Sequence, residues 1–135
     1  HGNGTQTVAE YEARLFFAST HQSPLYPGTG AANETGIDGN VVNVPMPAGT
    51  GGAAWRRAME AKVLPALDAF APELILVSAG FDAHAADPLA QMELVEADFA
   101  WGAQALREIA LQRCKGRLVS TLEGGYDLPA LAGSA

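Results

Sequence analysis

The feature of this 135-residue sequence that most constrains its fold is an unbroken apolar run, Leu74-Ile75-Leu76-Val77. A strand with one face in water alternates apolar and polar side chains, whereas a parallel strand covered by helices on both faces is apolar throughout. Three other runs are also apolar, contain β-branched or aromatic residues, and end in turn residues. The predicted strands are residues 14–20, 41–46, 73–79 and 117–122.

Two stretches between the predicted strands carry apolar residues at helical spacing. The first, residues 54–70, contains Pro65, which we expect to bend the helix or to start a new turn. The second begins near Glu96 and Asp98, whose charges suit a helix N-terminus, and it ends at Lys115-Gly116. Strands that alternate with helices predict an α/β fold with a parallel sheet, and the length fits one domain or part of one.

The charge balance excludes several classes of partner. Eight Lys and Arg against fifteen Asp and Glu give a net charge of −7, and no basic run is longer than Arg56-Arg57. Nucleic acids and anionic membrane surfaces require a concentrated positive face, so we expect neither as a partner. The single Cys114 cannot form an internal disulfide, which suits a reducing compartment and predicts a cytoplasmic location. The chain begins at His1 and not at Met, so we expect it to be part of a longer protein.

Polar residues follow three of the predicted strands, at the edge where parallel sheets bind ligands. Asp82 comes after an apolar strand, where a half-buried carboxylate is unfavourable unless it is paired, hydrogen-bonded or bound to a metal. A helix N-cap or turn aspartate is an equally good interpretation of Asp82. Tyr126 follows Gly124-Gly125 and either donates a hydrogen bond to a developing oxyanion or packs over a tight turn.

The sequence spacing of the candidate ligands does not by itself predict a zinc site. Asp82 and His84 have the i, i+2 spacing of a ligand pair, but zinc takes at least three protein ligands. His1, His21 and Cys114 show no zinc-like spacing to that pair. His84 by itself is better interpreted as a histidine of a loop or helix start.

The segment Gly49-Thr50-Gly51-Gly52 precedes the first predicted helix and offers backbone N–H groups to a phosphate. It lacks the spacing of the known phosphate-binding loops, and Thr50 as a helix N-cap is the better interpretation. A small α/β binding module for an anionic ligand nevertheless stays open as an alternative to an enzyme. A noncatalytic remnant, whose strand-end residues only pack, is another.

Four motifs in order resemble the histone deacetylase family, which includes bacterial acetylpolyamine amidohydrolases and acetoin-utilization proteins. The motifs are His1-Gly2-Asn3-Gly4-Thr5-Gln6, Tyr26-Pro27-Gly28-Thr29-Gly30, Ser78-Ala79-Gly80-Phe81-Asp82 and Glu123-Gly124-Gly125-Tyr126. The resemblance implies the arginase/deacetylase fold, a parallel sheet sandwiched between helix layers and present here only in part. Residues 1–135 would then be a single partial domain, the carboxyl-side portion of a deacetylase catalytic domain.

The resemblance also implies a reaction, the hydrolysis of an acetyl-amide to acetate and free amine. Zinc, or another divalent metal, would polarise the acetyl carbonyl and activate water, with a histidine as general base. Asp82 matches one zinc ligand and Tyr126 matches the residue that stabilises the oxyanion. The other two ligands and the catalytic histidines would precede His1, so we expect these residues alone to be inactive.

Further positions match supporting parts of such a site. Tyr26 and Leu89 match residues that line the acyl-lysine channel, where Gly124 supplies backbone. Ser19 by its hydroxyl and Thr20 by its carbonyl match a structural potassium site. The implied substrate is an acetylated small amine or an acetyl-lysine in a protein, and an oligomer is possible. An open sheet edge predicts that the isolated chain is poorly soluble.

Overall fold

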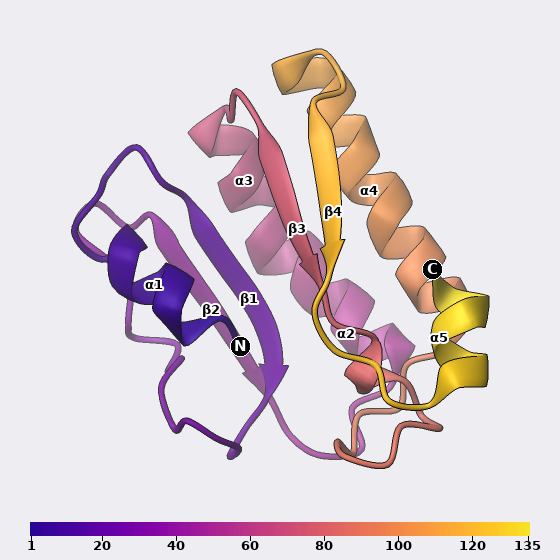
Figure 1. The fold of residues 1–135 in the computed structure, drawn as a ribbon. Coiled ribbons are helices and arrows are strands. Elements are labelled where there is room, and N and C mark those ends of the chain that lie inside the picture. The colour runs from indigo at the N-terminus through magenta and orange to yellow at the C-terminus, as the bar shows by residue number, and fades with distance from the viewer.

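The computed structural model describes residues 1–135 as an α/β molecule with parallel strands in two separate pairs (Figure 1). Strand β1 (Phe17–Gln22) pairs with β2 (Val41–Met46), and β3 (Ile75–Ala79) pairs with β4 (Leu118–Leu122). The α/β class and the parallel strands are therefore confirmed. These residues form two two-stranded sheets in which β1 does not pair with β3, so the predicted parallel sheet is present here only in part.

The first strand lies further along the chain than its apolar pattern predicts. A turn in which the Leu15 N–H donates to the Glu12 carbonyl, at 3.0 Å, delays its start, and Phe17 is the first residue to join β2. Ser19 and Thr20 lie within β1, which continues beyond them to Gln22. The other strands keep their predicted carboxyl ends, and these ends position the residues that follow.

The helix predicted over residues 54–70 is one run in three parts. It consists of α2 (Gly52–Ala58), a π-helical turn η1 (Met59–Val63) and α3 (Leu64–Phe70). Pro65 lies in the first turn of α3 and has no N–H to donate to a carbonyl in the preceding turn. The wider π turn stands directly before it, which agrees with the expectation that Pro65 starts a new turn.

The long helix α4 (Glu96–Cys114) begins and ends where its sequence indicates. At its start the Asp98 carboxylate accepts the Val95 N–H at 3.0 Å and pairs with Arg56 at 2.7 Å. At its end Lys115 and Gly116 adopt left-handed backbone angles, with φ of 58° and 78°. The short helices α1 (Asn3–Ala9) and α5 (Leu128–Ser134) were not expected from periodicity.

Helices pack on one face of each strand pair, and α3 and α4 are seen behind β3 and β4 in Figure 1. Alternate side chains of β2 pack against α2 and η1, and Ile75 of β3 packs against α3 and α4. Helix α1 lies on the opposite face of the β1–β2 pair, where Ala9 contacts Phe17 and Val41. The three clusters together form the core, whose fully buried side chains include Val41, Leu94 and Cys114.

The outward face of the β3–β4 pair is bare. Leu76 and Val119 are register partners on this face and are 71% and 55% exposed. Ile75 points the other way and is buried against α3 and α4. No element of residues 1–135 packs on the Leu76 side, so the second helix layer is not among these residues, in agreement with a sandwich that is present only in part.

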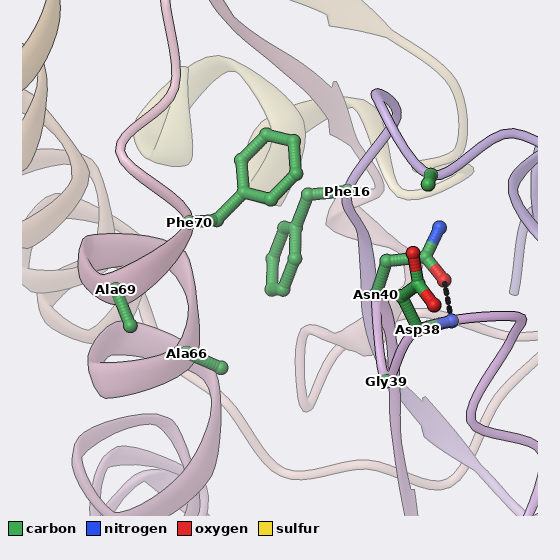
Figure 2. A pocket seen from close by; sticks show the side chains of 8 residues that line it. Phe16, Asp38, Gly39, Asn40, Ala66, Ala69 and Phe70 are labelled. Carbon is green, nitrogen blue, oxygen red and sulfur yellow. Dashed lines mark hydrogen bonds between the residues drawn. The ribbon is translucent and has the colours of Figure 1, made fainter.

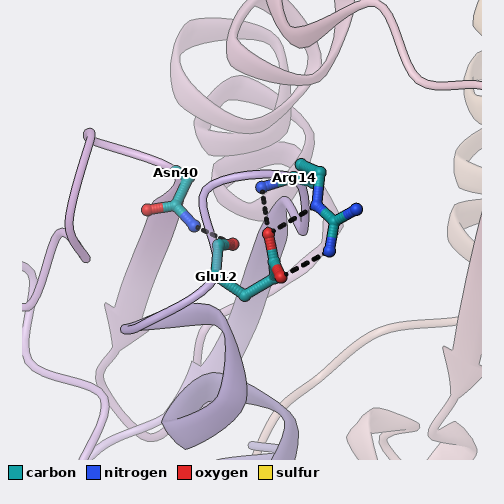
Figure 3. A network of polar contacts seen from close by, with 3 residues as sticks. All are labelled: Glu12, Arg14 and Asn40. Atoms are coloured by element: carbon teal, nitrogen blue, oxygen red, sulfur yellow. Dashed lines mark hydrogen bonds and ion pairs between the residues drawn. The ribbon is translucent and has the colours of Figure 1, made fainter.

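Asn40 fixes the turn between α1 and β1 (Figure 3). Its buried side-chain amide lies 2.8 Å from the carbonyls of Ala9 and Leu15 and 3.2 Å from that of Glu12. In the same turn, hydrogen bonds from Arg14 lower the pKa of the exposed Glu12 to about 2. None of the helices is sufficiently long and apolar to span a bilayer.

Candidate functional site

A cleft of about 2230 Å³ separates the two strand pairs. Residues of β1 line one side of it, and the strands β3 and β4 with the segments that follow them line the other. The lining includes most of the residues selected from sequence: Ser19, Thr20, Tyr26, Asp82, Gly124 and Tyr126. Leu89 is the exception, because it lies outside this lining and is 61% exposed.

Asp82 lies in a short 3-10 turn, η2 (Phe81–Ala83), directly after β3. Its carboxylate sits against the backbone of two glycines. A Cβ added at Gly124 would lie 2.8 Å from the carboxylate atoms, and one at Gly80 would lie 3.0 Å from Oδ1. Gly80 holds the N-cap position and no side chain caps this turn, so Asp82 is not a helix N-cap, although it is a turn aspartate, which was the other half of that interpretation. The carboxylate is half-buried and lines the cleft, and it accepts no hydrogen bond from the chain.

The segment that carries Tyr126 is hydrogen-bonded to the loop that carries Asp82. The Phe81 N–H donates to the Gly124 carbonyl, and the Tyr126 N–H donates to Oδ2 of Asp87, both at 2.8 Å. Gly125 has φ of 135° and lies against Phe81, which only a glycine accommodates without strain. The Tyr126 side chain is 56% exposed in the cleft. A fixed backbone with an accessible phenol is an arrangement that can present a hydrogen-bond donor to a ligand.

The β1 side of the cleft carries a histidine pair. The rings of His1 and His21 are 4.6 Å apart, the Ser19 hydroxyl is 3.0 Å from Nδ1 of His21, and Nε2 of His21 is 3.1 Å from the Gly30 carbonyl oxygen. Burial is the largest cause of the lowered pKa of His21, and the hydrogen bond to Gly30 opposes it. Gly30 has φ of 91°, and a Cβ there would lie 2.7 Å from His21. The second glycine of the Tyr26–Gly30 motif is therefore required for close packing on this histidine.

The remaining predicted site residues have different surroundings. The Thr20 hydroxyl accepts a hydrogen bond from the indole N–H of Trp55 at 3.0 Å, which ties β1 to α2. Tyr26 is 93% exposed at the cleft margin. The Leu89 N–H donates to Oδ1 of Asp87 at 2.9 Å. Thr20 is thus hydrogen-bonded to the core residue Trp55, whereas the side chains of Tyr26 and Leu89 are at the surface.

The residues present do not fit a zinc ion by themselves. A zinc site takes three or four protein ligands, and nowhere in residues 1–135 do three His, Cys, Asp or Glu side chains gather in a way that could hold a metal. Asp82 is one suitable carboxylate without partners from this chain. The other ligands of any such site must come from outside these 135 residues.

The glycine-rich segment before α2 does not form an anion site. Gly51, not Thr50, is the N-cap residue of α2, and the Thr50 hydroxyl donates instead to the Pro47 carbonyl at 2.6 Å. The prediction of Thr50 as N-cap is therefore wrong. The Asp98 carboxylate lies so close to Gly52 that a Cβ would not fit between them. A negative charge at this helix start opposes a bound anion, which argues against the binding-module alternative.

A smaller pocket of about 390 Å³ lies at the opposite end of β1 and β2 (Figure 2). It is bordered by Phe16 and Phe70, whose rings are 5.4 Å apart, and by Asp38 and Asn40. Parallel strands present ligand sites at their carboxyl ends, and this pocket is at their amino ends. The cleft is therefore the candidate site.

Two residues of the site were not selected from sequence. His21 follows Ser19 by two positions, and side chains at i and i+2 share one face of a strand, so the strand period was an available signal. Asp87 lies in an Asp-Pro turn, and nothing in the sequence connects it with Tyr126.

Comparison with known proteins agrees with this geometry. The histone deacetylase domain matches residues 1–135, the whole of the chain. Histone deacetylase 10, chloroplastic, of Oryza sativa subsp. japonica is 44% identical over 137 residues, which cover 99% of this chain and 31% of that protein. The histone deacetylase-like amidohydrolase of Pseudomonas aeruginosa is 42% identical over 130 residues, 93% of this chain and 34% of that protein.

A solved structure shows the same fold. The crystal structure of the HDA15 HD domain superposes with a TM-score of 0.89 and 38% identity, covering 99% of this chain and 39% of that one. The chain thus spans about a third of the length of the relatives named above and less than half of that structure. A domain match over every residue, together with parallel strands that carry these motifs to one cleft, shows that the chain belongs to the histone deacetylase family.

Proposed function

We propose that residues 1–135 are the carboxyl-side part of a deacetylase catalytic domain, which in complete form hydrolyses an acetyl-amide to acetate and free amine. One observation carries the proposal: in a chain of this family, Asp82 and Tyr126 line one cleft and their loops are hydrogen-bonded to each other. If the chain were a noncatalytic remnant, nothing would require the exposed Tyr126 phenol in that cleft, so this observation favours the enzyme.

In this proposal Tyr126 donates its phenolic proton in a hydrogen bond to the oxyanion that forms as the amide is attacked. Asp82 would contribute one carboxylate to a zinc site whose other ligands would lie outside these residues. Ser19 and Thr20 would hold a structural potassium ion. Tyr26 and Leu89 would border the acyl channel, with Gly124 as its backbone.

The proposed substrates are an acetylated small-molecule amine or an acetyl-lysine side chain of a protein. A net charge of −7 favours a cationic amine or a basic peptide over nucleic acid or an anionic membrane. We also propose a cytoplasmic location, because the one cysteine, Cys114, is buried and free. Assembly into an oligomer is compatible with this role.

The proposal is tested in the full-length protein with Tyr126→Phe and Asp82→Asn. We expect Tyr126→Phe to lower kcat by at least about 100-fold, which is the usual effect of removing one donor to an oxyanion. We expect Asp82→Asn to lower both kcat and the zinc content. Acetate release from an acetyl-lysine peptide and from an acetylated polyamine, together with metal analysis, gives the measurements.

Matched controls are Tyr11→Phe and Asp38→Asn, which change the same groups at exposed positions outside the cleft. Both should retain normal turnover. Near-normal deacetylation by Tyr126→Phe or by Asp82→Asn would remove that residue from the proposal. Full-length protein without any amidohydrolase activity would favour the remnant.

A further inference from the structure

The carboxylate of Asp87 connects the segment that carries Tyr126, which lines the cleft, with the turn that carries Leu89, which lies outside the cleft lining. Its Oδ2 accepts the Tyr126 N–H at 2.8 Å and its Oδ1 accepts the Leu89 N–H at 2.9 Å. The residue is 7% exposed, and its own N–H donates to the His84 carbonyl at 2.9 Å. Asp87 is therefore held in its turn, and both of its oxygens are used.

Tyr126 has few other constraints. The phenol is 56% exposed, and the Asp87 carboxylate is the partner of its backbone N–H. On its amino side, the Phe81 N–H holds the Gly124 carbonyl at 2.8 Å and Gly125 lies against Phe81, but neither contact reaches residue 126 itself. On its carboxyl side, Asp127 accepts the Ala130 N–H at 2.8 Å and caps α5. The direction in which residue 126 leaves the Gly-Gly turn thus depends on Asp87.

We propose that Asp87 is a positioning residue, which sets the backbone of Tyr126 and of Leu89 together through its two carboxylate oxygens. Its effect on turnover rests on the proposed deacetylase function, whereas its effect on the backbone does not. A displacement of about 1 Å at a reacting group lowers rates by up to about 100-fold, so a loose Tyr126 would be expected to reduce kcat.

The test is Asp87→Asn in the full-length protein. Asparagine has the same shape, but only one of its two terminal groups accepts a hydrogen bond, so one of the two N–H groups loses its partner. Hydrogen exchange measured by mass spectrometry should become at least about 10-fold faster in the peptide that contains Tyr126 or in the one that contains Leu89, and remain unchanged in peptides from β1 and β2. We expect kcat to fall by about 10- to 100-fold with a smaller change in KM.

A double mutant separates positioning from a general structural effect. If Asp87 acts through Tyr126, then Asp87→Asn should reduce kcat much less in a Tyr126→Phe background than in the wild type. Asp127→Asn is the matched control, because it removes the same charge beside Tyr126 and keeps an N-cap residue. It should change neither exchange nor turnover.

Three results would overturn the proposal: unchanged exchange at both peptides, faster exchange across the whole protein, or fully additive losses in the double mutant. If the protein proves to have no deacetylase activity, the proposed function fails, but the exchange experiment still decides whether Asp87 fixes Tyr126. Asp87→Glu provides a second variant, which keeps both acceptors and displaces them by one methylene. Its exchange in these two peptides should lie between the wild type and Asp87→Asn.

Discussion

At the residue scale, the absence of a side chain at Gly124 determines where Asp82 can lie. A Cβ added at position 124 would lie 2.8 Å from the carboxylate atoms of Asp82. The carboxylate can therefore keep its place only because residue 124 is a glycine. The same backbone accepts a hydrogen bond from Phe81. Small residues therefore let two loops approach closely enough for their functional groups to share a cleft.

Replacing Gly124 with alanine should displace the Asp82 carboxylate. Overpacking of this kind lowers the free energy of unfolding by about 1–3 kcal/mol, and we expect that range from urea denaturation of the full-length protein. Metal affinity and turnover should decrease as well. Gly4→Ala is the control, because Gly4 lies in α1 with no atom within 4 Å of the place that a Cβ would take, and alanine there should stabilise by about 0.5–1 kcal/mol. Equal stability of the two variants would contradict this account of Gly124.

At the element scale, two helices are joined by one ion pair near the start of α4. Asp98 has a side chain only 6% exposed, pairs with Arg56 of α2 at 2.7 Å, and accepts the Val95 N–H at 3.0 Å. The Arg56 guanidinium also donates to the Ala97 carbonyl and lies 5.5 Å from the centre of the Trp101 ring. The pair thus fixes the N-terminus of α4 and its crossing with α2.

Removing the buried member of this pair should strongly destabilise the protein. Asp98→Ala leaves Arg56 and the Val95 N–H without their shared acceptor, and we expect a loss of about 3 kcal/mol in the free energy of unfolding. Glu108→Ala, on the exposed surface of the same helix, should change that quantity by less than about 0.5 kcal/mol. Thermal and urea unfolding of both variants provide the comparison, and similar losses in the two would show that the Arg56–Asp98 pair has no special role.

At the scale of the whole molecule, the bare face of β3–β4 and the cleft edges leave apolar surface in water. Leu76 and Val119 are the clearest example of this exposed apolar surface, because they are register partners on paired strands. Exposed apolar strands promote association. The family relationship explains this surface if the remainder of a deacetylase domain covers it.

We therefore expect the isolated 135-residue chain to associate or to melt without cooperativity. The double variant Leu76→Thr with Val119→Thr should lower the associated fraction seen in sedimentation velocity, because it removes apolar groups from this face. Leu111→Thr with Val8→Thr makes the same changes at exposed positions on helices α4 and α1 and should have a smaller effect. A monomeric wild-type chain with a sharp cooperative melt would contradict the expectation.

Much of the fold was predictable because the signals are local. The apolar runs located the four strands, a proline without an N–H located the break in the α2–α3 helix, and Lys115-Gly116 marked the end of α4. The strand-end motifs identified the family and the residues around Asp82 and Tyr126. Short helices such as α1 and α5 were missed, because seven residues give too little periodicity to recognise.

What the sequence determined by itself was the kind of each strand and longer helix and the family to which the chain belongs, since spacing and residue type act within a few positions. Only the tertiary structure decided which strands pair, how the two pairs are separated, and that Asp87 holds Tyr126. The carboxylate and the N–H that it accepts are 39 residues apart in the chain. No local pattern encodes such a contact, because it forms only when the pairing of β3 with β4 brings the loops that follow them together.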